Sequence, residues 1–337
     1  MNDSHLRGRI LITTTLTFAM LAAASVAAQE SDSWQVPRTA DGQPDLQGVW
    51  ANNTLTPVER PAVFGDQEIL TDEDIRFLEQ RIAEITAEGG DALFGGGVLE
   101  AAFSGEIQSY DPSTGNYDQS WMAQRSVHRR TSQIIDPPTG KYPPRTEEAI
   151  AVANERRAYR QEHPADSWED RPLSERCISY GAPYLGSGYN SYWQIVQSEN
   201  YVTIIQEMIH DVRIIPLDGR PHIPDNVKLW HGDSRGYWDG DTLVIETRNY
   251  AEESDYGPDT AAKINVERLT RLGPDALQYE ITSHDPGTFS APYTRQIIFD
   301  HSPDPIYEYA CHEGNYGMMY ILSGHRAEER RAAEATD

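Results

Sequence analysis

The stretch "GYWDGDTLVIETRNY", residues 236–250, contains two segments of strand character joined by the short polar turn Asp239 to Asp241. Aromatic and β-branched residues dominate both segments, as is typical of β-strands. Similar segments recur through the second half of the chain: "YWQIVQSE", "YVTIIQEM", "VRIIPL", "INVERLTRL", "ALQYEITSH", "YTRQIIFDH" and "IYEYACHE". About eight or nine short strands with no helix between them favour antiparallel pairing.

Closing such a meander removes exposed strand edges. We therefore predict a mainly β fold, an antiparallel up-and-down barrel or strongly curved sheet of lipocalin type, over residues 177–326. Residues 29–176 are predicted to form an N-terminal segment with two helices and long loops packed on the barrel. Residues 327–337 read as a polar C-terminal tail.

Two helices are predicted before the strands. "LTDEDIRFLEQRIAEITAEGG", which starts at Leu70, has Thr71 as a cap, acidic residues in its first turn and apolar residues at helical spacing. A second helix, over residues 147–162, is polar and rich in arginine, and Pro164 closes it.

The N-terminus has the pattern of a signal peptide. Arg7 and Arg9 precede the apolar run "ILITTTLTFAMLAAASVA", and small residues at its end suit cleavage near Ala27 or Ala28. A membrane anchor is the alternative, but the run is short for a bilayer span and contains four threonines. We expect residues 1–28 to be removed and the mature protein to be periplasmic or secreted.

The net charge of the chain limits the kinds of partner that it can bind. A formal net charge of −25 repels nucleic acid and anionic lipid, so we expect neither a nucleic-acid partner nor membrane insertion after cleavage. The oligomeric state stays open.

Cys177 and Cys311 are the two cysteines and have no CxxC spacing. In an oxidising compartment they are predicted to form a disulfide, with two free buried thiols as the alternative.

The stretch "EMIHDVRIIPLDGRPH", residues 207–222, concentrates ionisable groups around an apolar run. Tyr201 to Leu217 is too long for one strand of a small barrel, so a bend or bulge is expected near His210. We predict Glu207 and Arg213 as a catalytic pair facing the barrel interior, with His210 brought to the same pocket by the bulge. A purely structural ion pair is the alternative.

Further candidates lie on neighbouring segments. The predicted substrate-binding residues are His222, His231, Tyr192, Trp238 and Glu267. The aromatic members could line a pocket for a ring-bearing ligand, or be plain core. No cofactor is expected; a divalent metal held by His210, His222 and His231 is a minority alternative, because their spacing matches no strong metal motif.

Four stretches, "DGQPDLQGVW", "IQEMIHDVRIIPLDGRPH", "WHGDSRGYWDGDTLVIETRNY" and "YEYACHEGN", cover about half of the chain together. They resemble a family of exported bacterial proteins of unassigned function. The resemblance implies export and a β-rich body, but no reaction and no catalytic residues. "GVW" at Gly48 to Trp50 is also similar to the GxW start of lipocalins.

The sequence lacks GxSxG, a Walker loop, GxGxxG and HExxH, the usual marks of several enzyme classes. Two functions remain. The first is an exported barrel enzyme that uses carboxylate, His and Arg side chains as a lyase, hydratase, isomerase or hydrolase on a small organic or sugar-derived substrate. The second is a non-catalytic, lipocalin-like binding protein for an apolar or aromatic small molecule. An enzyme should bring at least three of the groups in residues 207–231 into one pocket.

Overall fold

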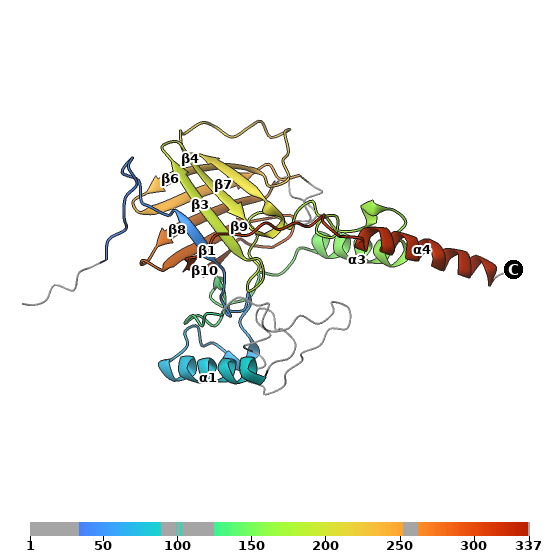
Figure 1. Cartoon of the computed structure of the whole chain (residues 1–337), viewed down its shortest axis with the longest axis horizontal. Helices are drawn as coiled ribbons and strands as arrows, with labels where there is room; N and C mark the ends of the chain where they lie inside the picture. Colours follow the sequence, from blue (N-terminus) through green and yellow to red (C-terminus); the bar gives the residue numbers. More distant parts are fainter. Residues whose placement is uncertain (1–33, 89–98, 100–101, 103–124, 252–261, 336–337) are drawn as a thin grey trace, which may run out of the picture. The chain divides into compact units, whose positions relative to one another are not determined.

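The computed structural model describes residues 34–88, 99, 102, 125–251 and 262–335 (Figure 1). The expected signal peptide, residues 1–28, lies outside these ranges. Val36–Asp337 form one compact unit. None of the helices in the described part of the chain combines the length and the apolar character needed to span a bilayer.

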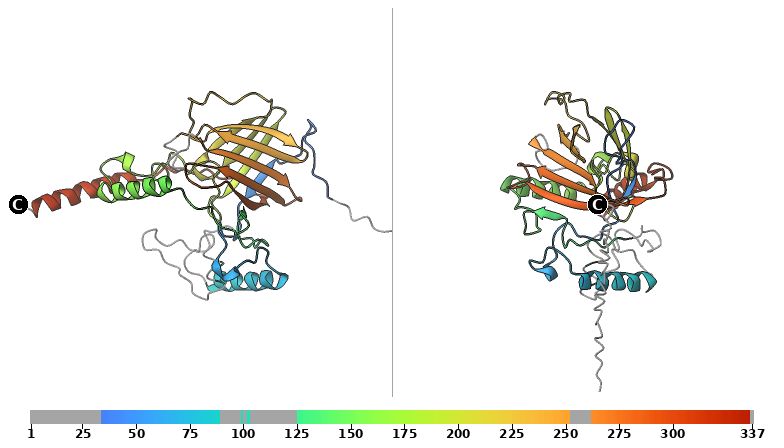
Figure 2. Two further views of the ribbon diagram at one scale, coloured as in Figure 1. Left: turned by 180° about the vertical axis from the view of Figure 1, so that it is seen from behind. Right: turned by 90° about the vertical axis from the view of Figure 1, so that its left-hand side faces the viewer.

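Ten strands form one antiparallel sheet, which confirms the predicted mainly β fold. The strands are β1 (Gly48–Ala51), β2 (Ile134–Asp136), β3 (Tyr192–Ser198), β4 (Tyr201–Gln206), β5 (Val212–Pro216), β6 (Asp233–Asp239), β7 (Thr242–Arg248), β8 (Ile264–Arg271), β9 (Ala276–His284) and β10 (Tyr293–Ser302). Their order is β5–β4–β3–β1–β10–β9–β8–β7–β6, and β2 pairs with β10. The sheet is strongly curved rather than closed, as Figure 2 shows.

The two edge strands, β5 and β6, nevertheless approach each other. A Cβ atom added to Gly236 of β6 would lie 2.8 Å from the Leu217 side chain and 2.9 Å from that of Ile215 on β5. The absence of a side chain at this position lets the curled sheet bring its edges together. Packing of side chains, rather than a ladder of backbone hydrogen bonds, therefore fills the gap between the edges.

The strand nearest the N-terminus lies in the middle of the sheet. β1 pairs with β3 on one side and with β10 on the other, and Trp50 stands opposite both Trp193 and His301. β1 and β2 both come from the segment before Cys177, so that segment supplies part of the sheet as well as packing on it.

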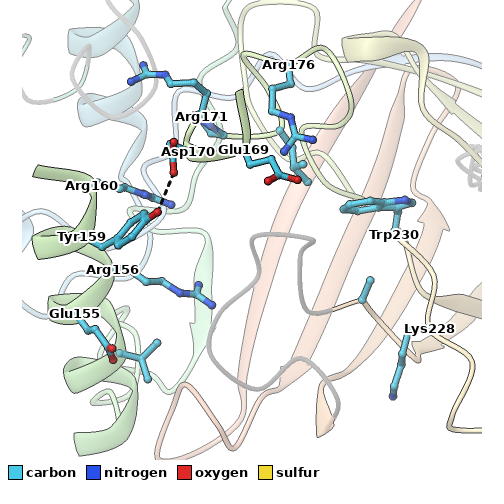
Figure 3. Close-up of a pocket in the computed structure, with 14 residues that line it drawn as sticks. Glu155, Arg156, Tyr159, Arg160, Glu169, Asp170, Arg171, Arg176, Lys228 and Trp230 are labelled. Atoms are coloured by element: carbon cyan, nitrogen blue, oxygen red, sulfur yellow. Dashed lines mark hydrogen bonds between the residues drawn. The ribbon is translucent and has the colours of Figure 1, made fainter. Parts of the chain in front are cut away.

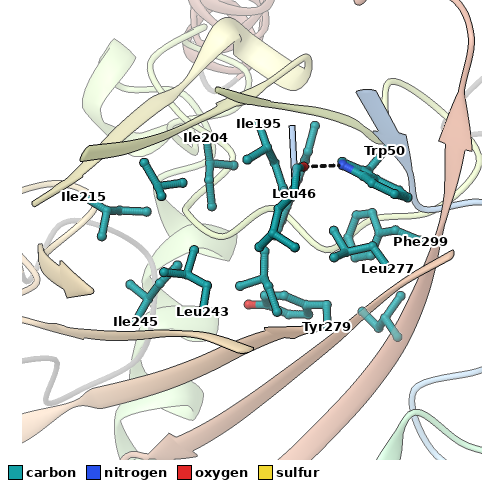
Figure 4. Close-up of a cluster of buried hydrophobic side chains, with 14 of the residues drawn as sticks. Leu46, Trp50, Ile195, Ile204, Ile215, Leu243, Ile245, Leu277, Tyr279 and Phe299 are labelled. Carbon is teal, nitrogen blue, oxygen red and sulfur yellow. Dashed lines mark hydrogen bonds between the residues drawn. The ribbon is translucent and has the colours of Figure 1, made fainter. Parts of the chain in front are cut away.

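Large side chains fill the concave face of the sheet (Figure 4). Trp50, Trp193, Tyr279 and Phe299 are all buried there, together with aliphatic residues of β3, β4, β5, β7, β8, β9 and β10. Alternate residues of β8 and β9 are buried, as expected for strands with one face on a core. The interior is therefore a packed core.

A buried ion pair crosses this core and corrects one prediction. Arg213 of β5 donates two hydrogen bonds to Glu267 of β8, at 2.6 and 2.8 Å, and Tyr279 donates to the same carboxylate at 3.0 Å. Arg213 faces the interior as predicted, but its partner is Glu267, so the predicted pair with Glu207 is wrong. The chain reverses between β4 and β5 in a hairpin whose connection contains the 3₁₀ turn Met208–His210, so counting alternate residues through it fails.

Among the described residues, the longer helices are α1 (Asp72–Glu88), α3 (Glu147–Glu162) and α4 (Gly317–Glu334). Thr146 caps α3 by accepting a hydrogen bond from the Ala149 amide, as its position before an acidic first turn favours. The sequence patterns did not predict α4. They predicted a strand over residues 306–313, and this prediction is wrong because that segment forms no strand.

The predicted disulfide is present. Cys177 and Cys311 are bonded, with their Cα atoms 5.7 Å apart. The bond joins the loop before β3 to the segment between β10 and α4, which crosses the end of the sheet close to Glu207: the Tyr307 amide donates to Glu207 Oε1 at 3.3 Å. Residues 134 positions apart are thus held together at this end of the sheet.

Candidate functional site

The predicted catalytic Glu207 lies directly after β4 and is 5 % exposed. Its Oε2 atom is buried without a hydrogen-bond partner in the described structure. Burial raises the pKa of Glu207, while hydrogen bonds from the Tyr307 amide and the Asn190 side chain oppose the shift. Burial and the nearby Glu207 charge likewise raise the pKa of Tyr192, a predicted binding residue. Glu207 and Tyr192 are therefore neighbours.

The expected bend near His210 is confirmed, and it is conformationally unusual. Ile209 and His210 both have left-handed backbones, with φ of 52° and 48°, which non-glycine residues seldom adopt. His210 is exposed, and its Nδ1 atom lies 3.3 Å from the Tyr309 carbonyl oxygen. The turn therefore directs His210 to the surface, away from the core that holds Arg213.

His222 sits between two carboxylates that are already paired. Its Nδ1 atom is 2.7 Å from Asp233 Oδ2, and its Nε2 atom is 3.3 Å from Glu246 Oε1. Arg235 donates to Asp233 at 2.6 Å, and Arg248 binds the Glu246 oxygen that faces His222. Each carboxylate thus has its own guanidinium partner, so the cluster neutralises itself.

His231 belongs to another cluster. Its Nε2 atom lies 3.0 Å from Ser179 Oγ and 3.4 Å from Asp211 Oδ1, and Ser179 Oγ donates to Asp211 Oδ2 at 3.0 Å. In a Ser-His-Asp triad the carboxylate binds the ring nitrogen opposite the serine. Here both partners crowd one nitrogen, so the arrangement is a local polar contact and not a nucleophile relay.

The predicted groups therefore do not converge. Arg213 and Glu267 are in the core, Trp238 packs against that core, and His210, His222 and His231 have separate partners. The candidate functional site lies elsewhere, in a groove that none of these residues lines.

This groove is a hollow of about 970 Å³ beside α3. Figure 3 shows its walls: α3 contributes Arg156, Tyr159 and Arg160 on one side, and the loop before β6 contributes Lys228 and Trp230 on the other. The segment after the 3₁₀ turn Trp168–Asp170 forms a further wall. A second hollow of about 780 Å³ shares Arg156 and Arg160 and extends to β10. We call the two together the basic groove.

Its charge is opposite to that of the chain. The cationic residues that line it are Arg145, Arg156, Arg157, Arg160, Arg171, Arg176, Lys228 and Lys263. The acidic residues that line it are Glu155, Glu169, Asp170 and Asp285. The whole chain has 28 Lys and Arg against 53 Asp and Glu, so this concentration of positive charge makes the groove an attractive place for an anion.

Within the part of the chain that the structure describes, some of these cations have ion-pair partners and others do not. Arg171 binds both oxygens of Glu175, at 2.8 and 2.9 Å, and Arg176 lies over the Trp168 ring, 4.4 Å from its centre. In the described part of the chain, Arg156, Arg160 and Lys228 take part in no side-chain ion pair. These three charges are available to a ligand.

Aromatic side chains accompany the unpaired cations. Trp230 is 44 % exposed and Tyr159 is 51 % exposed, and Tyr159 donates a hydrogen bond to Asp170 at 3.2 Å, which fixes its ring. An exposed indole face that lines the same hollow as guanidinium groups can hold a planar ring while the cations bind its charged substituent.

The arginine spacing on α3 is itself unfavourable to the helix. Arg156 and Arg160 are four residues apart, so they lie on the same face and repel each other. A bound anion between them would offset this repulsion. The arginine-rich composition of residues 147–162 was visible in the sequence, but nothing in the sequence placed Trp230, 70 residues later, opposite this helix.

Comparison of the chain with protein-family models, with curated proteins and with solved structures found no match.

Proposed function

We propose that the protein binds an aromatic carboxylate in the basic groove. The observation that carries the proposal is that Arg156, Arg160 and Lys228, which have no ion-pair partner in the described part of the chain, line the same hollow as the exposed Trp230 in an otherwise acidic chain. Trp230 would stack on the ring, and the guanidinium groups would bind the carboxylate in a bidentate manner.

The binding role fits the packed interior of the sheet. A lipocalin-type carrier needs a cavity inside the sheet, whereas large buried side chains fill the concave face here. The hollow outside the sheet, at about 970 Å³, has the size of a typical small-molecule site. A surface groove is therefore the better-supported site.

Ligand charge provides the direct test. Isothermal titration of the mature protein should show binding of 1-naphthoate, and at least tenfold weaker binding of the isosteric neutral 1-naphthamide, because the amide cannot form charge-assisted hydrogen bonds. The naphthoate affinity should also fall as salt is added. Equal binding of the two compounds, or no binding of either, would contradict the proposal.

A second candidate is acid–base chemistry at Glu207, as a lyase, hydratase, isomerase or hydrolase. One observation favours it: Glu207 is a buried carboxyl with a free Oε2 atom and a raised pKa, next to Tyr192 and the left-handed turn at His210. Displaced pKa values and strained backbone are frequent at catalytic sites.

A metabolite screen tests this second candidate. Mass spectrometry of a mixed pool incubated with the wild-type protein should show a substrate lost and a product formed, and Glu207→Gln should abolish the change while the protein stays folded. His284→Ala, at the exposed end of β9, is the matched control. Turnover that survives Glu207→Gln would rule out this role.

Export completes the proposal: the chain acts in the periplasm or outside the cell after loss of residues 1–28, as its N-terminal pattern predicts. The disulfide Cys177–Cys311 supports an oxidising location. The intact mass of the protein recovered from a periplasmic fraction should lack the first 27 or 28 residues.

A further inference from the structure

A cluster of metal-ligand type lies between α4 and the loop that follows α3. Asp166, His325 and Glu329 offer three ligand atoms that all lie within 4.8 Å of one another. His325 and Glu329 are four residues apart on α4 and thus share a face. Asp166 comes from the loop, so the cluster joins two segments far apart in the sequence.

In Asp166 and in Glu329, one carboxylate oxygen lies near His325 and the other contacts a different neighbour. Asp166 Oδ1 lies 3.2 Å from His325 Nε2, while Oδ2 lies 2.6 Å from His163 Nδ1. Glu329 Oε1 lies 3.5 Å from His325 Nε2, while Oε2 lies 3.0 Å from Arg326 Nη1. One oxygen of each carboxylate thus lies near His325 Nε2, and the other is held by His163 or Arg326.

Such outer contacts orient the ligands of natural metal sites. Arg326 adds a further restraint, because its Nη2 atom donates to the backbone carbonyls of Ala165 and Asp166 at 2.8 and 2.9 Å. The ligand atoms are therefore positioned by the protein in advance.

The two separations measured from His325 Nε2 match the geometry of a tetrahedral ion. Two ligand atoms each about 2.1 Å from a tetrahedral zinc ion are about 3.4 Å apart. The two distances from His325 Nε2, 3.2 and 3.5 Å, bracket this value. Without a cation, one imidazole N–H can donate fully to only one of the two carboxylates.

From this geometry we infer that Asp166, His325 and Glu329 bind a divalent transition-metal ion of the zinc class and so fix α4 to the loop after α3. An imidazole among the ligands favours zinc over magnesium or calcium, which prefer oxygen atoms alone. Three protein ligands leave a fourth position for water.

The His222 cluster shows the contrast. There Arg248 binds the same Glu246 oxygen that faces the imidazole, and Arg235 binds Asp233, so arginine already occupies the place of a cation. Among the described residues, the only guanidinium contact with a side-chain carboxylate of the Asp166 cluster is that of Arg326 with the outward Glu329 oxygen. Among the described residues, Asp166, His325 and Glu329 also form the group in which three ligand atoms lie within 4.8 Å of one another.

Titration of the untagged, chelator-treated mature protein with ZnCl₂ tests the inference, with bound metal counted by native mass spectrometry. We expect one Zn²⁺ per chain, no binding of Mg²⁺ at the same concentration, and a raised melting temperature with zinc. His325→Ala and Asp166→Asn should each weaken zinc binding at least tenfold, while His284→Ala should bind like the wild type.

Glu329→Gln, on the exposed face of α4, keeps the test valid if His325→Ala fails to fold. Absence of stoichiometric zinc binding, or wild-type affinity in the folded His325, Asp166 and Glu329 variants, would overturn the inference. Neither outcome depends on naphthoate binding, so this site and the basic groove are judged separately.

Discussion

The core of the sheet and the basic groove use the same side chain in opposite ways. Arg213 in the core is 3 % exposed, and both of its terminal nitrogens bind Glu267. Arg156 and Arg160 in the groove are exposed and have no carboxylate partner in the described structure. An arginine that is paired with a buried carboxylate stabilises the fold, whereas an arginine without an ion-pair partner is available to bind a ligand.

This difference also explains why the ionisable groups of residues 207–231 were a poor guide to the site. The stretch from Glu207 to His231 is rich in ionisable groups, but its members are divided among the core, a self-neutralised cluster and a polar contact. The groove takes its charges from distant segments, and what sets it apart is the lack of partners.

Loss of the core arginine should have the largest effect. Arg213→Ala leaves the Glu267 carboxylate buried and uncompensated, and should reduce the free energy of unfolding by about 3–5 kcal/mol. Urea denaturation measures this change. A loss of less than about 1 kcal/mol would mean that the Glu267 carboxylate is solvated or neutral in the folded state. That result would contradict the claim that Arg213 serves the fold by neutralising a buried charge.

Replacing the whole buried network sharpens that result. The triple variant Arg213→Met, Glu267→Leu, Tyr279→Phe removes every polar partner together, so its stability should lie within about 2 kcal/mol of the wild type. The same denaturation experiment compares the two variants. If the triple variant is as unstable as Arg213→Ala, the damage comes from packing and not from an unpaired charge.

The buried Glu207 carboxyl should make the free energy of unfolding depend on pH. Its folded pKa is raised above the unfolded value of about 4.3, so the folded state holds the extra proton and loses stability as pH rises through the folded pKa. Glu207→Gln mimics the protonated form. The stability of this variant relative to wild type should therefore increase from pH 4 upward and then level off. Parallel stability curves would contradict the raised pKa.

The groove arginines should have the smallest effect on stability. Arg160→Gln removes the like-charge repulsion with Arg156 and should stabilise the protein by about 0.2–0.5 kcal/mol. Arg330→Gln, on the exposed surface of α4, is the matched control. A clear destabilisation by Arg160→Gln in thermal unfolding would show that Arg160 has a structural partner.

Much of the fold was predictable because local signals determine it. Strand alternation placed β3 to β10, and Pro164 marked the end of α3. The bend near His210 followed from the length of its segment. The reversal of the chain there could not be predicted in the same way, because a strand pattern does not reveal its partner, and the pairing of Arg213 with Glu267 depends on the sheet order.

The site was less predictable for a related reason. Both the basic groove and the Asp166–His325–Glu329 cluster join segments separated by many residues, and neither forms a motif within one segment. The Cys177–Cys311 bond is an exception, since two cysteines in an oxidising compartment leave a single possible pairing.

Affinity for 1-naphthoate in the double variant Arg156→Gln, Arg160→Gln tests the central claim most directly. Isothermal titration at low salt should give a dissociation constant at least tenfold above that of the wild type, because two charge-assisted contacts are lost while the fold is kept. Arg330→Gln should bind like the wild type. Unchanged affinity in the folded double variant would contradict the claim that the unpaired arginines of α3 form the binding site.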